Sequence, residues 1–143
     1  GTTAINEMQA TIKEGVVSVN GRLLRLRLAG IADGTYQLAV RPERLCPAED
    51  GASDFSLPVL QIEFTGNEVG VRCNGAEIGA GTVRVQLRPD SFAQLRQGRN
   101  VGERIPLSIA EGAALIFDSA GRRLTALQMQ TPLAPEDRHE YAV

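Results

Sequence analysis

The sequence is poor in the residues that most often mark catalytic, metal or nucleic-acid sites. It has no tryptophan, one histidine (His139), and two cysteines, Cys46 and Cys73, without CxxC spacing or a neighbouring histidine. A zinc site or a Cys/His nucleophile is therefore not expected, and the two thiols are predicted to be buried and reduced. Four phenylalanines and two tyrosines offer few rings for stacking on bases, so no nucleic-acid partner is expected.

Long apolar runs and a strong excess of one charge are also lacking. No apolar run approaches the length of about 18 residues that spans a bilayer. The formal net charge is only -2, and both features indicate a soluble domain. Lys13 is the one lysine among 15 basic residues, a skew that genome composition explains as easily as function. The chain begins Gly1-Thr2-Thr3 without a methionine, which predicts a fragment of a longer protein.

A phosphate-binding loop is missing as well. The sequence contains no Gly-x-x-x-x-Gly-Lys-Ser/Thr, so it lacks the glycine-rich backbone and the lysine that cradle nucleotide phosphates. No acid, base and nucleophile cluster together along the chain either. We therefore expect no enzyme activity and no cofactor in this chain by itself.

Alternating apolar residues dominate what is present. Val17 and Val19 precede Asn20-Gly21, and Leu24, Leu26 and Leu28 follow it. Asn-Gly most favours a two-residue hairpin turn, because both central residues take positive φ there. The pattern predicts a β-hairpin with the valines and leucines on its buried face.

Further short strands are expected along the chain, separated by glycine-rich and asparagine-rich turns. They are predicted over residues 35–40, 58–65, 69–73, 82–87, 104–109 and 114–117. In the second of these, Leu60, Ile62 and Phe64 share one face. Residues 90–97 alone read as a helix, capped by Asp90 and ended by Gly98. The sequence therefore predicts an all-β barrel or sandwich with one short helix.

Two segments carry candidate functional residues. Arg41-Pro42-Glu43 ends the predicted strand over residues 35–40, because proline lacks an amide hydrogen and restricts its neighbour to extended geometry. One interpretation is a strand terminator with a local Arg/Glu pair, and the other is a contact with a neighbouring subunit. In residues 118–123, Asp118 is expected to accept backbone amides and Gly121 to supply positive φ, either as a plain turn or as a partner surface.

Arg25 and Arg27 alternate with the hairpin leucines. This alternation predicts a solvated outer face, and an anion site or a nucleic-acid stripe is the alternative.

Three ordered segments are similar to one protein family. They are YQLAVRPERL at 36–45, LQIEFTGNEVGVRC at 60–73 and VGERIPLSIAEGAALIFDSAGRRL at 101–124. Together they resemble the TOBE-type, OB-like regulatory domain that follows the nucleotide-binding domain in bacterial ABC-importer ATPases of the maltose, glycerol-phosphate, polyamine and ferric-iron types. The resemblance extends over about residues 5–124. It implies an OB-like barrel of short antiparallel strands.

The resemblance also implies a division of the chain and a function. Residues 1–10 would lead in from an ATPase domain, residues 11–130 would form the regulatory domain, and residues 131–143 would form a flexible tail. The full-length subunit would use ATP and Mg²⁺, pair weakly with itself, and act with permease subunits at the cytoplasmic face of the inner membrane. Candidate interface or regulatory residues are Arg41, Pro42, Glu43, Asp118 and Gly121. The transported substrate is not encoded here.

A second resemblance gives an alternative function. Asn6 and Gly15-Val16-Val17 are similar to the start of molybdate-binding modules, which hold small oxyanions between subunits. The sequence departs from those modules because it lacks a second copy of this motif and carries the Arg-Pro-Glu and Phe-Asp segments instead. Small-oxyanion binding is therefore the alternative to a regulatory domain.

Overall fold

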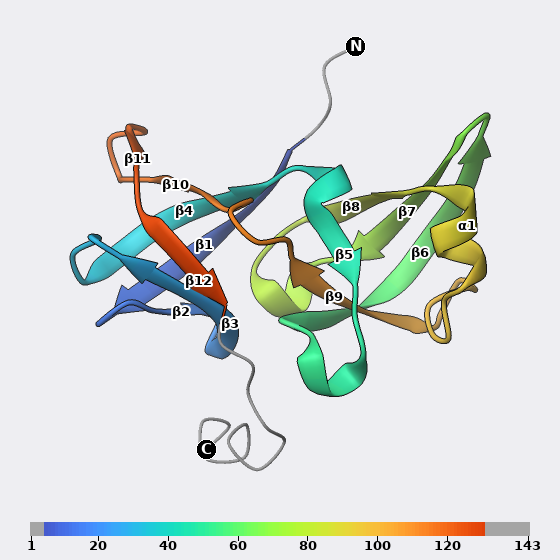
Figure 1. The fold of residues 1–143 in the computed structure, drawn as a ribbon, viewed down its shortest axis with the longest axis horizontal. Helices are drawn as coiled ribbons and strands as arrows, with labels where there is room; N and C mark the ends of the chain where they lie inside the picture. Colours follow the sequence, from blue (N-terminus) through green and yellow to red (C-terminus); the bar gives the residue numbers. More distant parts are fainter. Residues whose placement is uncertain (1–4, 131–143) are drawn as a thin grey trace.

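The computed structural model describes residues 5–130, where strands form two antiparallel sheets side by side (Figure 1). The larger sheet has seven strands in the order β11-β10-β4-β1-β2-β3-β12, and the smaller has five in the order β5-β9-β6-β7-β8. The larger sheet comprises β1 (Asn6–Lys13), β2 (Val16–Val19), β3 (Arg22–Ala29), β4 (Gly34–Val40), β10 (Leu115–Phe117), β11 (Arg123–Leu124) and β12 (Leu127–Gln130). The smaller comprises β5 (Leu45–Pro47), β6 (Phe55–Thr65), β7 (Glu68–Asn74), β8 (Thr82–Leu87) and β9 (Arg104–Ile109).

Short helical segments join the strands. One α-helix, α1 (Pro89–Ala93), follows β8, and the 3-10 turns are η1 (Pro42–Arg44), η2 (Asp50–Ala52) and η3 (Ala76–Ile78). None of the helices in residues 5–130 has the length and apolar character that crossing a bilayer requires. The predicted all-β, OB-like fold with one short helix is confirmed.

The Asn20-Gly21 hairpin forms as predicted between β2 and β3. Asn20 has φ 50° and Gly21 has φ 82°, which is the conformation that Asn-Gly favours. The two valines and three leucines of the alternating pattern are all buried. Because period-two alternation places every second side chain on one face, this hairpin contributes a continuous apolar surface to the core.

The core is one contiguous cluster of buried side chains drawn from both sheets. Met8 and Leu38 enter it from the larger sheet, and Phe55, Leu57 and Leu107 from the smaller. Each fully buried side chain of this size stabilises the fold by about 1.5–3 kcal/mol relative to its exposed state. The two sheets therefore share a single apolar interior.

The prediction for β6 was wrong in its start and in the face of Leu60. The strand begins at Phe55, three residues before the predicted start, and its register shifts by a bulge between Val59 and Gln61. The bulge inserts an extra residue, so Leu60 points outward and is 49% exposed, while Phe64 at the strand end is 69% exposed. The core-facing side carries Phe55, Leu57 and Val59 before the bulge, and Ile62 and Phe64, opposite the buried Val71 and Val69, after it.

The predicted helix over residues 90–97 is shorter than expected. Helix α1 ends at Ala93, and its N-cap is Arg88 rather than Asp90, without a side-chain capping bond. Pro89 starts the helix instead, because its fixed φ is preset for the first helical position. Phe92 is buried as the apolar spacing implied.

Four strands lie where none was predicted, namely β1, β5, β11 and β12. Strand β1 covers residues 6–10 of the predicted leading segment and pairs with both β2 and β4, at the centre of the larger sheet. The predicted flexible tail, residues 131–143, lies outside the described residues.

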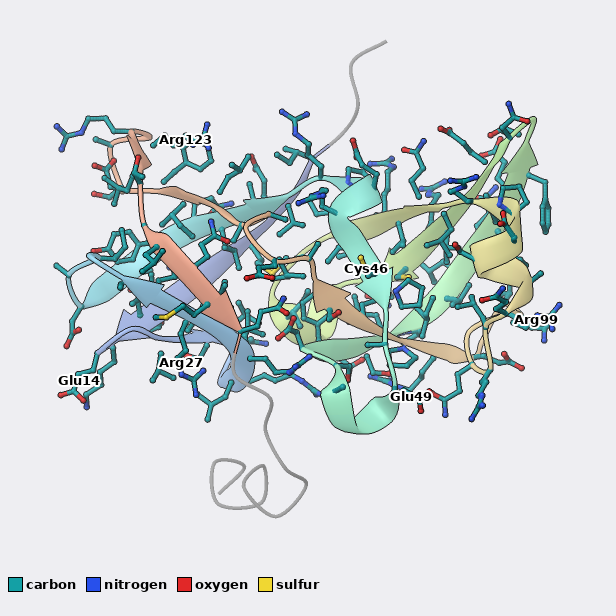
Figure 2. All side chains as sticks on the ribbon, in the orientation of Figure 1. Glu14, Arg27, Cys46, Glu49, Arg99 and Arg123 are labelled. Atoms are coloured by element: carbon teal, nitrogen blue, oxygen red, sulfur yellow. The ribbon has the colours of Figure 1, made fainter. Side chains whose placement is uncertain are left out.

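The two cysteines differ in environment. Cys73 is buried on the core face of β7, and burial raises the pKa of its thiol to about 12. Cys46 is exposed, so its predicted burial was wrong (Figure 2). The cause is the alternation of side chains along β5, because Leu45 points into the core and Cys46 therefore points outward.

Candidate functional site

The candidate residues lie beside two different parts of β4, its C-terminal end and its middle. Arg41, Pro42 and Glu43 follow the last residue of β4, whereas Asp118 follows β10, whose Phe117 lies opposite Gln37 of β4. Arg41 lies four positions beyond Gln37 along the extended chain, which amounts to roughly 13 Å at about 3.3 Å per residue. The structure therefore places the two groups of candidates apart.

The Arg-Pro-Glu segment ends β4 as predicted. Arg41 is extended, with φ -69° and ψ 147°, and the chain then turns through η1, which lies against β8. Pro42 is buried, whereas Arg41 and Glu43 are exposed. The predicted local Arg/Glu pair does not form, since the ion pairs within residues 5–130 join Arg104 to Glu77 and Arg122 to Asp118. Both charges at this corner are therefore directed to solvent.

A buried asparagine joins the two sheets beside this corner. The Asn6 side chain is 4% exposed and lies opposite the backbone of Arg84 in β8. Its Nδ2 donates to the Arg84 carbonyl at 2.8 Å, and its Oδ1 accepts from the Arg84 amide at 2.7 Å. The Asn6 side-chain amide thus bonds to the edge strand β8 as a neighbouring strand would, and it satisfies the backbone amide and carbonyl of Arg84 at once.

A buried aspartate makes the second joint, and sequence reasoning missed it. Asp54 is 1% exposed, and its carboxylate accepts from the Arg25 amide at 2.7 Å and the Ile109 amide at 2.8 Å. These bonds connect β3 to β9. Arg22 Nε also donates to the Asp54 carbonyl at 3.1 Å. No local pattern marks this role, because the partners lie far along the chain.

Arg25 and Arg27 lie on the face opposite the hairpin leucines as predicted, but that face is only partly solvated. Both side chains are half-buried and donate to backbone carbonyls. Arg25 Nη1 donates to Ala52 of η2 at 2.6 Å. Arg27 Nη1 donates to Leu24 and Leu26 at 3.0 and 3.3 Å, beside the register shift between β2 and β3. A bulge leaves carbonyls without ladder partners, and this guanidinium satisfies them.

The turn between β10 and β11 has the predicted chemistry. Asp118 Oδ1 accepts from the Ala120 and Arg122 amides at 2.9 Å each, and Oδ2 accepts from Arg122 Nε at 3.1 Å. The backbone hydrogen bond from Arg122 is the largest cause that lowers the pKa of Asp118 below its usual value. Gly121 has φ 80°, the left-handed conformation that favours glycine.

A shallow hollow of about 590 Å³ lies beside this turn. Gln9, Gln37 and Phe117 form one row across β1, β4 and β10, and Glu7 and Asp118 also line the hollow. Among the described residues that line the hollow, there is no arginine or lysine. Side-chain amides and carboxylates suit neutral or cationic groups rather than an oxyanion. Within the described part of the chain, no group of three His, Cys, Asp or Glu side chains is placed to hold a metal.

Replacing Gly121 with valine is expected to lower the melting temperature more than replacing Ser119 with alanine. A β-branched residue is strongly disfavoured at φ 80°, by about 1–2 kcal/mol, whereas Ser119 is an exposed turn residue. An added Cβ at Gly121 meets no atom within 4 Å, so the loss reports backbone strain alone. Thermal melts followed by circular dichroism test this, and equal midpoints for the two variants contradict it.

The geometry defines an all-β, OB-like domain whose candidate residues lie at the end of a strand and in a hairpin turn. Comparison with known families gives a match to the TOBE domain over residues 38–117, which is more than half of the 143-residue chain. The chain belongs to the TOBE domain family, whose domain is non-catalytic. A search of curated proteins found no match.

Proposed function

We propose that this chain is the regulatory and dimerisation domain of the ATP-binding subunit of an ABC importer. The observation that carries the proposal is the TOBE match over residues 38–117, which overlaps all three segments that resemble such importer subunits. The all-β fold with exposed charged corners is consistent with a domain that contacts other domains rather than one that performs chemistry.

The proposed role assigns the chemistry to the rest of the subunit. ATP and Mg²⁺ would bind the ATPase domain, and hydrolysis would be coupled to permease subunits at the cytoplasmic face of the inner membrane. This domain would help to hold two ATPase domains together as they open and close. Arg41 and Glu43 are suited to such a contact because both are exposed at a corner that η1 and the buried Pro42 fix in place.

Self-association of the isolated chain is expected to be weak. Other subunit contacts would share the work of pairing in a full transporter, so this domain needs only part of the affinity. The chain should be mostly monomeric at micromolar concentration and dimerise toward the millimolar range. Charge reversal at Arg41 or Glu43 should weaken the dimer, whereas Lys13→Glu, at the opposite end of β1, should not.

Sedimentation equilibrium across that concentration range measures the association. A tight dimer at nanomolar concentration contradicts the proposal, and so does the absence of association at every concentration. An effect of Lys13→Glu equal to that of Glu43→Arg contradicts the assignment of the contact to the Arg-Pro-Glu corner.

Small-oxyanion binding is the second candidate, and the resemblance of Asn6 and Gly15-Val16-Val17 to molybdate-binding modules supports it. The Asn6 amide, however, already pairs with the Arg84 backbone, and the Arg25 and Arg27 guanidiniums bond to backbone carbonyls. Equilibrium dialysis with molybdate, tungstate, sulfate and phosphate separates the two candidates. We expect no stoichiometric binding, and a stoichiometric complex would favour the oxyanion module.

A further inference from the structure

The sequence contains Asn-Gly twice, at residues 20–21 and 74–75, and the fold places the two pairs in different surroundings. In this dipeptide the backbone nitrogen that follows asparagine can attack the side-chain carbonyl carbon, because glycine has no Cβ to crowd the approach. The attack expels the side-chain nitrogen as ammonia and closes a succinimide ring, which water then opens to aspartate or isoaspartate. Whether the reaction occurs in a folded chain depends on the freedom of the glycine nitrogen and of the turn around it.

The fold blocks this reaction at Asn74-Gly75. Gly75 is buried, and its amide donates to the Gly81 carbonyl at 2.9 Å. An added Cβ at Gly75 would lie 2.5 Å from that carbonyl oxygen and 2.7 Å from Cγ2 of Val83, so this peptide is packed tightly against its neighbours. The Asn74 Oδ1 also accepts from the Ala76 amide at 3.0 Å. Attack by the Gly75 nitrogen would require these contacts to break.

The Asn20-Gly21 turn lacks these restraints. Both residues are exposed, and an added Cβ at Gly21 meets no atom within 4 Å. Among the hydrogen bonds of turns and loops in residues 5–130, none engages the Gly21 amide. The Asn20 Nδ2 donates to the Glu77 carbonyl at 3.0 Å, a bond that engages the nitrogen that leaves rather than the carbon that is attacked. An exposed hairpin tip opens at little free-energy cost, so the Gly21 nitrogen can reach the Asn20 side chain without unfolding of the sheet.

We propose that Asn20-Gly21 is a site of spontaneous deamidation in the folded protein, and that the fold protects Asn74-Gly75. The Gly21 nitrogen bonds to Cγ of Asn20 as the bond from Cγ to Nδ2 breaks, and the proton lost by the attacking amide leaves with the ammonia. One water molecule then adds across either carbonyl-to-nitrogen bond of the ring, which gives aspartate or isoaspartate at position 20. Water is the only co-reactant, and the site does not depend on the importer assignment.

Deamidation at this turn alters a joint between the two sheets. The hydrogen bond from Asn20 to Glu77 connects the hairpin of β2 and β3 with η3, which lies between β7 and β8 of the smaller sheet. Both products lack the Nδ2 donor, and in the aspartate product a carboxylate oxygen replaces it and faces another acceptor. Isoaspartate also adds a methylene to the backbone of a two-residue turn, whose length fixes the register of the strands. The products therefore loosen the attachment of the hairpin to the smaller sheet.

Peptide mapping by mass spectrometry tests the proposal, because trypsin releases the two asparagines in separate peptides, 14–22 and 73–84. The folded chain is incubated at mildly alkaline pH, and a sample digested without incubation gives the background. Deamidation of peptide 14–22 is expected to be faster than that of peptide 73–84, on the order of tenfold or more, because Asn74 reacts only through rare local opening. In urea the two rates should converge, since both asparagines precede glycine.

Two results of this experiment would overturn the proposal. The first is an equal rate for the two peptides in the folded chain, or a faster reaction at Asn74. The second is a difference of the same size in urea, because the fold would then not be its cause.

The variant Asn20→Asp measures what the modification does to the joint. The turn is retained, because Asp-Gly also favours a two-residue hairpin. Loss of the donor to the Glu77 carbonyl is expected to lower the melting temperature by roughly 2–5 °C. Asn74→Asp is the matched control, because aspartate keeps the acceptor for the Ala76 amide, so its melting temperature should equal that of the unmodified chain. Equal melting temperatures for the two variants would contradict the role of Asn20 as a joint between the sheets.

Discussion

Replacing Asp54 with alanine is expected to lower the free energy of unfolding by roughly 2–5 kcal/mol. The substitution leaves the amides of Arg25 and Ile109 buried without their carboxylate acceptor. Each buried donor without a partner costs about 1–3 kcal/mol. Since a domain of this size is stable by about 5–15 kcal/mol, the loss takes away a large share of the total.

Urea denaturation followed by far-ultraviolet circular dichroism measures this loss. Asp33→Ala is the matched control, because Asp33 is exposed and accepts a single backbone amide, that of Glu14, at 2.8 Å. The control should cost under about 1 kcal/mol, as surface substitutions of this kind usually do. An Asp54→Ala variant as stable as Asp33→Ala would show that Asp54 does not join β3 to β9.

Replacing Gly98 with alanine is expected to destabilise the fold by about 3 kcal/mol. Gly98 has φ 82°, and an added Cβ would lie 2.4 Å from the Cβ and 2.9 Å from the Cα of Ile105. The left-handed backbone costs about 1–2 kcal/mol for a non-glycine residue. The clash adds about 1–3 kcal/mol, because the atoms in the way belong to a strand of the core and cannot rotate aside.

Gly102→Ala provides the control within the same loop. Gly102 has φ 92°, but an added Cβ there meets no atom within 4 Å. Both variants carry the backbone cost, so the difference between their urea midpoints isolates the contact with Ile105. Equal midpoints would mean that the loop moves away from β9 at little cost.

Much of the fold was predictable because period-two alternation is a local signal. The hairpin at Asn20-Gly21 and strands β8 and β9 lie where the pattern placed them. In β6, however, a bulge after Val59 breaks the alternation, and only the pairing with β7 shows it. Strands β5 and β11 contain three and two residues, too few for a period to be recognised.

The candidate site was predictable to the extent that its chemistry is local. Asp118 and Gly121 form their turn within five residues, so sequence alone indicated both roles. Asn6 and Asp54 depend on partners 78 and 55 residues away, and no spacing rule reveals such pairs.

The most direct test of the regulatory-domain proposal is the sequence of the coding region immediately upstream of the codon for Gly1. The proposal predicts, in the same reading frame and within the preceding few hundred codons, a Gly-x-x-x-x-Gly-Lys-Ser/Thr loop followed by the signature helix of an ABC ATPase. An upstream frame that encodes neither motif would contradict the assignment of this TOBE domain to an importer ATPase.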